Sequence, residues 1–250
     1  MHAPQTRMQL TGLTPAPTTP MINCSVVVPE PIDTSPIRSP QAVHTVLAHH
    51  FRGRSVVEIG TRNGDGMACF SRVASHATAV EMSREYCEKL RARAAGAFDV
   101  SCKSYQAGLP DADVYTWWQQ WPTLTNHRLL DHLARRHREG AIRASAEAIF
   151  VVDMLWSYDR RSWKKLQALA AWSKRVPYDE AAACRARSKG EQSSKQLKLC
   201  TRAKGEFLVV GMPLRTVAAS ELFTARTASA KGRSSSGVGR RLFARTRVFL

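Results

Sequence analysis

The sequence lacks the cysteine and histidine patterns that bind structural metals. None of its six cysteines forms a Cys-x-x-Cys pair, and its eight histidines include no His-x-x-x-His or His-Glu-x-x-His pattern. A structural metal site is therefore not expected. Several cysteines fall within apolar segments, and we interpret them as buried free thiols of an intracellular protein in a reducing compartment. Whether that compartment is the cytoplasm, the nucleus or an organelle stays open.

Long hydrophobic runs are also absent. No apolar segment approaches the roughly 20 residues that cross a bilayer, so a membrane span is not expected. Residues 1–29 contain one arginine and no acidic residue. They have no continuous apolar core, which argues against a secretory signal. An organellar presequence is the alternative, weakened by the shortage of arginine.

Acidic residues are scarce, and the resulting charge is uneven. The chain has 37 Lys and Arg against 20 Asp and Glu, a formal net charge of +17. Residues 184–250 hold 15 of the basic residues and three of the acidic ones. Flexible cationic segments bind phosphate backbones without reading their sequence. We therefore expect this C-terminal quarter to contact RNA or a ribonucleoprotein, with a solvated basic loop as the alternative.

The distribution of proline separates an arm from a domain. Residues 1–38 are rich in Pro and Thr, which disfavours helix and central strand and predicts an extended or disordered arm. Residues 39–250 are long enough to bury a full core. We expect them to form one domain with basic surface insertions at about 175–205 and 226–241. Ser39-Pro40 is typical of a helix start and predicts a helix over 41–51.

From residue 55 onward, short β-branched runs alternate with amphipathic helical segments. Such alternation predicts an α/β fold with a doubly wound, mostly parallel sheet. The last two predicted strands have no clear crossover helix between them, so we expect an antiparallel strand pair at the C-terminal edge. The predicted strands span residues 55–59, 77–81, 98–103, 114–117, 148–152, 206–210 and 242–250, and the predicted helices span 65–75, 83–95, 123–138 and 161–173.

The loop after the first strand carries the main chemical signal. It reads Glu58-Ile-Gly60-Thr-Arg62-Asn-Gly64-Asp-Gly66. Glycine allows positive φ and a close approach of a ligand to the backbone, and the free N–H groups of a helix follow. Glu81 ends the next strand, where a carboxylate can accept hydrogen bonds from ribose hydroxyls. Loop and acid together predict a site for an adenosine-containing ligand.

These residues resemble the first two motifs of the class I S-adenosylmethionine-dependent methyltransferases, an acid before Gly-x-Gly-x-Gly and a second acid closing the second strand. The resemblance covers about residues 40–250 as an order of elements, and about 55–120 as specific motifs. It implies S-adenosylmethionine as cofactor. It places the catalytic candidates Asp113 and Tyr115 near the transferable methyl group. The cofactor-binding residues that it implies are Glu58, Gly60, Arg62, Gly64, Glu81, Ser104 and Tyr105.

The chain departs from this family pattern at two places. Arg62 stands where the family's middle glycine is usual, and its side chain would crowd the cofactor, point outward or clamp a carboxylate. No Asn-Pro-Pro-Tyr or Asp-Pro-Pro-Tyr follows the fourth strand, so the signature of amino-group methylation on bases or glutamine is missing. A dinucleotide dehydrogenase is the rival for the same loop, but its glycine spacing fits poorly.

Aromatic and acidic residues follow the fourth and fifth strands. Trp117, Trp118 and Trp156 are predicted to line a cleft and contact an acceptor, with core packing as the alternative. Asp153 closes the fifth strand and is the third catalytic candidate, either as a base or as a residue that binds the substrate. Its structural alternative is a helix cap or an ion pair with a nearby arginine.

Three functions are compatible with these features. The first is an active methyltransferase acting on RNA or a ribonucleoprotein component. The second is a catalytically inactive methyltransferase fold that serves as a structural subunit of a large RNA–protein or organellar assembly. The third is a small-molecule methyltransferase with a basic surface. Methyl transfer depends mainly on positioning, so the lack of an acid–base dyad excludes none of them.

Overall fold

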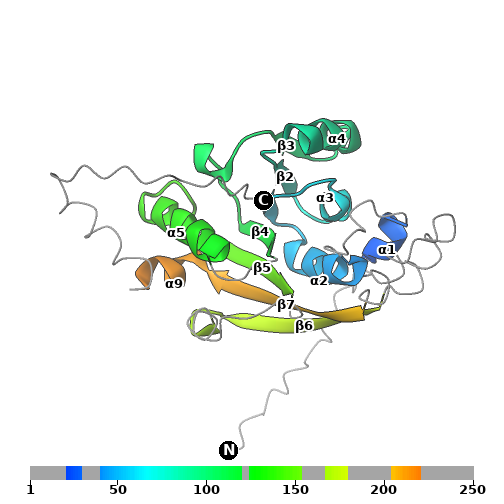
Figure 1. The fold of residues 1–250 in the computed structure, drawn as a ribbon. Helices are drawn as coiled ribbons and strands as arrows, with labels where there is room; N and C mark the ends of the chain where they lie inside the picture. Colours follow the sequence, from blue (N-terminus) through cyan, green and yellow to red (C-terminus); the bar gives the residue numbers. More distant parts are fainter. Residues whose placement is uncertain (1–20, 30–39, 120–123, 154–166, 180–203, 221–250) are drawn as a thin grey trace, which may run out of the picture.

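A computed structural model describes residues 21–29, 40–119, 124–153, 167–179 and 204–220 (Figure 1). The strands are β1 (Ser55–Ile59), β2 (His76–Val80), β3 (Asp99–Ser101), β4 (Val114–Gln119), β5 (Glu147–Asp153), β6 (Trp172–Asp179) and β7 (Lys204–Pro213). The helices are α1 (Cys24–Val27), α2 (Gln41–Phe51), α3 (Asp65–Phe70), α4 (Arg84–Ala94), α5 (Leu124–Arg138) and α9 (Leu214–Ala219), with a 3-10 turn η1 (Tyr105–Ala107).

The seven strands form one sheet in the order β3-β2-β1-β4-β5-β7-β6. Pairing is parallel from β3 through β5, whereas β7 runs antiparallel to both β5 and β6. The predicted fold class is thereby confirmed, including the antiparallel pair at one edge. The strand order reverses between β1 and β4, and α/β sheets bind their ligands beyond the carboxyl ends of the strands at such a switch point.

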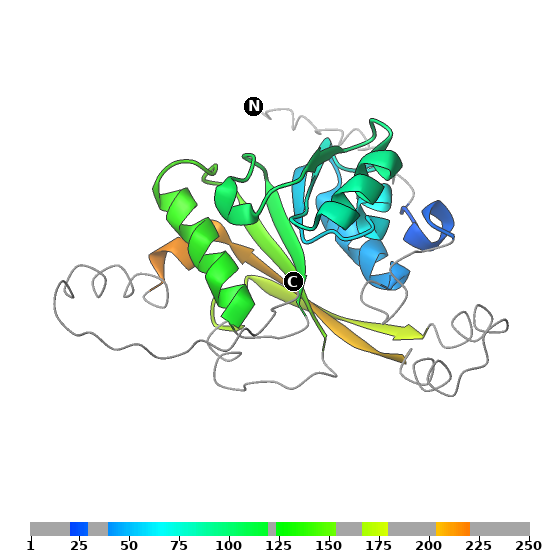
Figure 2. The ribbon, with the colours of Figure 1, turned by 45° about the horizontal axis from the view of Figure 1, so that its top comes forward.

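Helices cover both faces of the sheet (Figure 2). Side chains along a strand alternate between the two faces, so neighbouring residues of β1 enter different cores. Val57 packs into the core under α5 and α9, whereas Val56 packs into the core under α1, α2 and α3. These two apolar layers cover both faces of β1 and β4, which lie side by side in the middle of the sheet.

The edge strand β6 corrects the sequence-based assignment. Residues 172–179 were expected to lie partly in a helix and partly in a basic surface insertion, but they pair with β7 from Trp172 to Asp179. Only Val176 and Tyr178 are buried apolar residues there, next to exposed Lys174 and Arg175. An edge strand has one apolar face and tolerates charge and proline on the other, so its hydrophobic pattern was too weak to recognise.

Most other predicted elements are confirmed within a few residues. The helix expected over 65–75 ends earlier, at Phe70. The helix expected over 161–173 lies largely outside the described residues, and the strand expected over 242–250 lies wholly outside them. The partner of β7 at the edge of the sheet is therefore β6.

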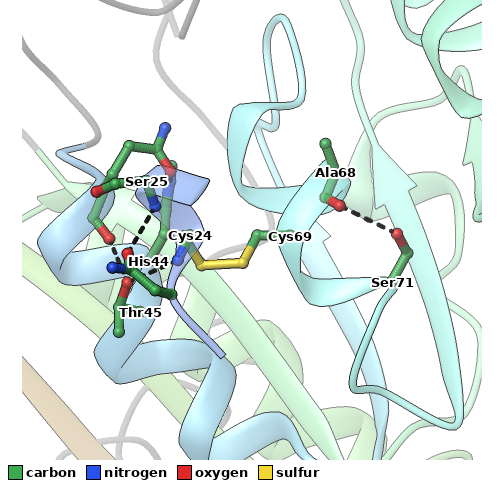
Figure 3. Close-up of a disulfide and its surroundings, with 9 residues drawn as sticks. Cys24, Ser25, His44, Thr45, Ala68, Cys69 and Ser71 are labelled. Carbon is green, nitrogen blue, oxygen red and sulfur yellow. Dashed lines mark hydrogen bonds between the residues drawn. A yellow bond between two sulfur atoms is a disulfide. The ribbon is translucent and has the colours of Figure 1, made fainter. Parts of the chain in front are cut away.

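Part of the predicted N-terminal arm belongs to the folded core. Helix α1 buries Cys24, and Val28 after it is also buried. Cys24 forms a disulfide with Cys69 of α3, with 5.5 Å between the Cα atoms (Figure 3). A second disulfide joins Cys87 to Cys102. The prediction of free thiols is therefore wrong for these four cysteines, because residues distant in sequence meet in the fold; Cys184 and Cys200 lie outside the described residues.

Neither a membrane span nor a metal centre occurs in the described part of the chain. None of the helices described there is both long and apolar enough to cross a bilayer. The same residues contain no group of three or more His, Cys, Asp or Glu side chains arranged to hold a metal ion.

Candidate functional site

The loop between β1 and α3 lies at the carboxyl edge of the sheet and is built on three left-handed residues. Gly60, Arg62 and Gly64 have φ values of 75°, 56° and 80°. The first and last are glycines, which adopt this conformation without steric cost, whereas Arg62 pays for it with backbone strain. Gly64 then caps the amino end of α3.

The strained Arg62 backbone is held by the carboxylate of Glu81. The Arg62 N–H donates to Glu81 Oε2 at 2.9 Å, and the Ser83 N–H donates to Glu81 Oε1 at 2.8 Å. Glu81 is only 4% exposed. The acid predicted to bind a ribose therefore also fastens the loop to the end of β2. Each carboxylate oxygen can accept a further hydrogen bond.

The Arg62 side chain points away from the loop. Its Nη2 donates to the hydroxyl oxygen of Tyr86 at 3.0 Å, and its Cζ lies 5.3 Å from the centre of the Tyr86 ring. An added Cβ at Gly60 would meet no atom within 4 Å. Of the three orientations considered for Arg62, the structure shows the outward one, and the space beside Gly60 is open.

The other two loop glycines are required by packing. A Cβ on Gly64 would lie 2.6 Å from Leu90 Cδ2 of α4. A Cβ on Gly66 would lie 2.8 Å from the Phe70 ring and 3.1 Å from both Glu58 Oε1 and His44 Nε2. Gly64 was expected to border the cofactor, but its missing side chain faces α4.

A buried polar group lies behind the loop. Glu58 is 3% exposed, and its register partner Thr116 on β4 and His44 on α2 are fully buried. Burial lowers the pKa of His44 to about 4. Three atoms here, His44 Nε2, Thr116 Oγ1 and Trp118 Nε1, are buried without a hydrogen-bond partner among the described residues. Such atoms commonly bind ordered water or a ligand.

The other candidates follow β3 or lie in the last residues of β4 and β5, at the same edge of the sheet. Ser104 caps η1 by accepting the Gln106 N–H, and Tyr105 is half-buried with its ring edge-on to His132 of α5. Trp117 is buried and stacks on Phe150, as the core alternative predicted. The remaining candidates are described only in part: Trp118 is half-buried with its ring edge-on to His44, Asp153 is the last residue of β5, and Trp156 lies outside the described residues.

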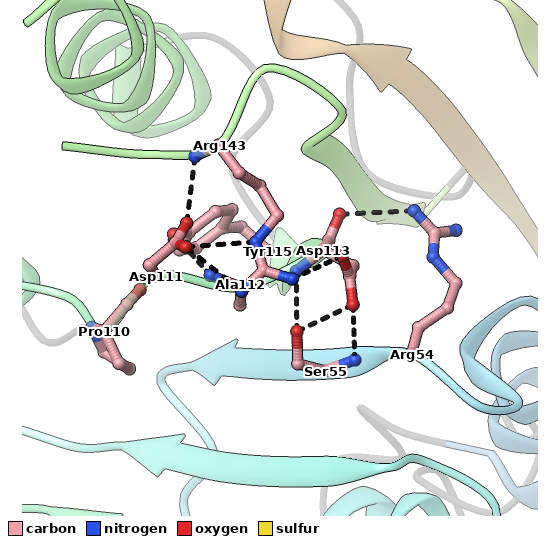
Figure 4. A network of polar contacts seen from close by, with 8 residues as sticks. All are labelled: Arg54, Ser55, Pro110, Asp111, Ala112, Asp113, Tyr115 and Arg143. Carbon is pink, nitrogen blue, oxygen red and sulfur yellow. Dashed lines mark hydrogen bonds and ion pairs between the residues drawn. The ribbon is translucent and has the colours of Figure 1, made fainter. Parts of the chain in front are cut away.

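Asp113 and Tyr115 lie at the opposite, amino edge of the sheet (Figure 4). Asp113 Oδ2 accepts from the Ser55 N–H and Oγ, both at 2.8 Å, and its Oδ1 accepts from Arg143 at 2.6 Å. The Tyr115 hydroxyl donates to Pro110 O, and burial raises its pKa to about 12. The expectation that these residues approach the transferable group is therefore corrected. Both belong to the start of β4, whereas the loop stands at the end of β1.

The arginines at the end of α5 are used within the fold. Arg135 pairs with Glu139, Arg136 donates to the carbonyl of Leu109, and Arg138 donates to the carbonyl of Ala218. These contacts tie α5 to the loop before β4 and to α9. Most of residues 184–250 lie outside the described ranges, so the structure leaves the basic C-terminal quarter a prediction.

Sequence reasoning missed two members of the site. Asp65 is 1% exposed and forms an ion pair with Arg93 of α4 at 2.7 Å. His44 comes from α2, before the motif begins. An acid at the first position of a helix and an arginine near the end of another are both typical surface features, so nothing local distinguished them. For His44, the one available signal was its place on the apolar side of its helix.

Known proteins resemble this chain in structure and not in sequence. No protein-family model matches the chain, and no curated protein sequence does. Protein 1320 of Thermoplasma acidophilum is similar in structure, with a TM-score of 0.50 at 12% identity over 77% of this chain and 98% of that one.

Two further solved structures have methyltransferase names. A geranyl diphosphate methyltransferase in complex with S-adenosylmethionine has a TM-score of 0.49 at 11% identity, over 69% of this chain and 84% of that one. An rRNA methylase from Streptococcus thermophilus has a TM-score of 0.40 at 12% identity, over 69% and 95%. Likeness at such identities concerns the fold alone. The sheet order and antiparallel edge are those of the Rossmann-like fold of class I methyltransferases.

Proposed function

We propose that the chain is an S-adenosylmethionine-dependent methyltransferase whose cofactor lies over the β1–α3 loop. The open space beside Gly60 is the observation that carries the proposal. It lies at the switch point of the sheet, where α/β folds bind ligands, and Arg62 leaves it free by turning toward Tyr86.

The surrounding residues fit the cofactor's polar ends. Glu81, at the end of β2, has acceptor capacity left on each carboxylate oxygen for ribose hydroxyls. Next to Gly66, the Glu58 carboxylate and the unpartnered His44 nitrogen, with the unpartnered Trp118 nitrogen beside His44, suit the methionine ammonium and carboxylate. S-adenosylmethionine supplies a methyl group activated by its sulfonium. The chain's own part is to orient that group and exclude water, which suffices for an in-line displacement.

We further propose RNA or a ribonucleoprotein component as the acceptor. The support is the charge of residues 184–250, which hold 15 of the 37 basic residues and three of the 20 acidic ones. Neutralising phosphates releases counterions and makes binding strongly salt-dependent. The alternative acceptor is a small molecule, which would bind with little dependence on salt.

A structural, non-catalytic role is supported by one observation. Both oxygens of Glu81 already accept backbone N–H groups within the chain, so the acid has a role in folding that needs no cofactor. The two functions differ in whether S-adenosylmethionine binds.

Calorimetric titration of the full chain with S-adenosylmethionine tests the proposal. A Gly60→Leu variant fills the open space, and we expect its affinity to fall at least about 100-fold. Gly53→Leu is the matched control: Gly53 also has positive φ, at 69°, and no atom within 4 Å of an added Cβ, but precedes β1 at the other edge of the sheet. Absence of binding heat with millimolar ligand in the wild-type chain would favour the structural role.

Filter binding of RNA across a salt series tests the acceptor. We expect log K to fall linearly with log salt, and the slope to shrink by about 0.7 for each phosphate-contacting cation removed. Replacing Lys231, Arg233, Arg240 and Arg241 by alanine is the informative variant. A flat salt response of the wild-type chain would exclude RNA as the acceptor.

A further inference from the structure

One face of α4 contacts the second half of the β1–α3 loop, from Arg62 to Asp65. Tyr86, Leu90 and Arg93 follow at intervals of four and three residues, which places them along one side of a helix. Tyr86 accepts a hydrogen bond from the Arg62 side chain. Leu90 packs against Gly64 so closely that a Cβ there would be 2.6 Å away. Arg93 reaches the last part of the loop.

Arg93 makes the polar part of this contact. Its Nη1 lies 2.7 Å from Asp65 Oδ1 and donates to the carbonyl of Asn63 at 2.9 Å. The Arg93 side chain is 20% exposed and that of Asp65 is 1% exposed. A single guanidinium therefore neutralises the buried Asp65 carboxylate and holds the loop backbone at Asn63, the two residues on either side of Gly64. Both contacts are made by the same nitrogen, and lysine would have to reach them from a more flexible stem with a compact ammonium group.

The first turn of α4 is covalently fixed at the same edge. Cys87 forms its disulfide with Cys102, which directly follows β3. Between them runs the segment that carries the ribose-binding candidate: the Glu81 N–H donates to Ser101 O at 3.0 Å, and Cys87 Sγ lies 3.2 Å from Glu81 O. Cys87 is buried, whereas Cys102 is half-buried. In the other disulfide, Cys24 and Cys69 are both fully buried. Cys102 is therefore the most accessible of the four disulfide-bonded cysteines.

We propose that α4 acts as a clamp that sets the conformation of the loop, with Arg93 as its positioning residue, and that the Cys87–Cys102 disulfide places this clamp under thiol–disulfide control. The effect on S-adenosylmethionine binding rests on the proposed function. The effect of α4 on the conformation of the loop does not. Reduction by a dithiol transfers two electrons and two protons to the sulfurs, giving two thiols and the cyclic disulfide of the reductant. It frees the start of α4 from β3 and loosens Glu81.

Arg93→Met and Arg93→Lys test the positioning role. We expect Arg93→Met to weaken S-adenosylmethionine binding by roughly tenfold or more. Amide hydrogen exchange at residues 61–66 should accelerate without any ligand, with partial restoration by Arg93→Lys. Arg143→Met is the matched control, because Arg143 bridges Asp111 and Asp113 at the amino edge of the sheet. It should leave both readouts unchanged. Unaltered exchange of the loop in Arg93→Met would overturn the positioning role.

Titration before and after mild treatment with dithiothreitol tests the disulfide. We expect reduction to weaken S-adenosylmethionine binding severalfold and to accelerate exchange at residues 81–87, while alkylation and mass spectrometry locate the new thiols at Cys87 and Cys102. Cys102→Ala should resemble the reduced chain and no longer respond to the reductant. An identical response of wild type and Cys102→Ala would overturn the redox control. If the wild-type chain fails to bind the cofactor, the proposed function fails, and the exchange data still decide on the clamp.

Discussion

The two edges of the sheet contain the same kinds of residue in different surroundings. At the amino edge, Asp113 accepts hydrogen bonds from Ser55 and Arg143, and Arg54 bridges Glu147 and the Asp113 carbonyl. These contacts occupy both carboxylate oxygens of Asp113 with partners within the fold. At the carboxyl edge, Asp65 and Arg93 form a similar pair, but beside them Gly60 borders open space. Carboxylate–arginine pairs alone thus do not mark a site; what distinguishes the carboxyl edge is the glycine loop at the switch point of the sheet.

Removing one acid from each edge is expected to have the largest effect. Asp65→Ala leaves Arg93 without its buried partner and should cost about 3–5 kcal/mol of unfolding free energy, together with most S-adenosylmethionine binding. Asp113→Ala should cost about 2 kcal/mol, because its side chain is partly exposed, and leave binding intact. Urea unfolding and calorimetry measure both quantities. Loss of binding in Asp113→Ala at temperatures where it is folded would remove the distinction between the edges.

Lowering the pH should reduce the free energy of unfolding through His44, which lies behind the loop at the carboxyl edge. Its pKa is lowered from 6.5 to about 4 in the folded chain, so the unfolded chain binds the additional proton between these values. Stability is then fully present above about pH 6.5 and falls as the pH drops toward 4, by on the order of 3 kcal/mol.

The charged and titratable groups around His44 are Asp65, Arg93 and Glu58, on α3, α4 and β1. Urea unfolding at several pH values measures the change, with His44→Gln as the control that cannot titrate. Equal pH dependence in both chains over this range would contradict the role of His44.

Tyr115→Phe is expected to have a smaller effect, confined to the amino edge. The hydroxyl donates to Pro110 O at 2.8 Å and accepts the Ala112 N–H at 3.1 Å. Losing both should cost about 1–2 kcal/mol with no change in S-adenosylmethionine affinity. A lower rate of methyl transfer in the fully folded variant would instead show that Tyr115 is a catalytic residue.

Arg62→Gly should have the smallest effect. Glycine relieves the backbone strain at φ 56° but loses the contact with Tyr86, so the net change in stability should stay within about 1 kcal/mol. Because the side chain already points outward, and Leu90 and Arg93 still hold the loop, cofactor affinity should change little. A clear loss of affinity on titration would show that Arg62 contacts the ligand.

The central fold was predictable from local patterns. The buried strands β1, β4 and β5 are mostly apolar, interrupted inside by Glu58 and Thr116, and capping residues and glycines separate them from their helices, so local and tertiary preferences agree there. Strand β6 escaped because an edge strand buries only alternate residues such as Val176 and Tyr178. The loop glycines and Glu81 were likewise visible, since their residue types and spacing are themselves the signal.

By itself, the sequence determined the α/β class, the position of the glycine loop and the concentration of positive charge after residue 184. Only the tertiary structure decided which residues surround that loop. It turned Arg62 toward Tyr86, paired Arg93 with Asp65, and brought His44 and Glu58 together beside Gly66. It also joined Cys24 to Cys69 and placed Asp113 at the amino edge of the sheet. Periodicity reports which face of an element is buried. Partners separated by tens of residues are chosen by how those faces pack, and no local pattern contains that information.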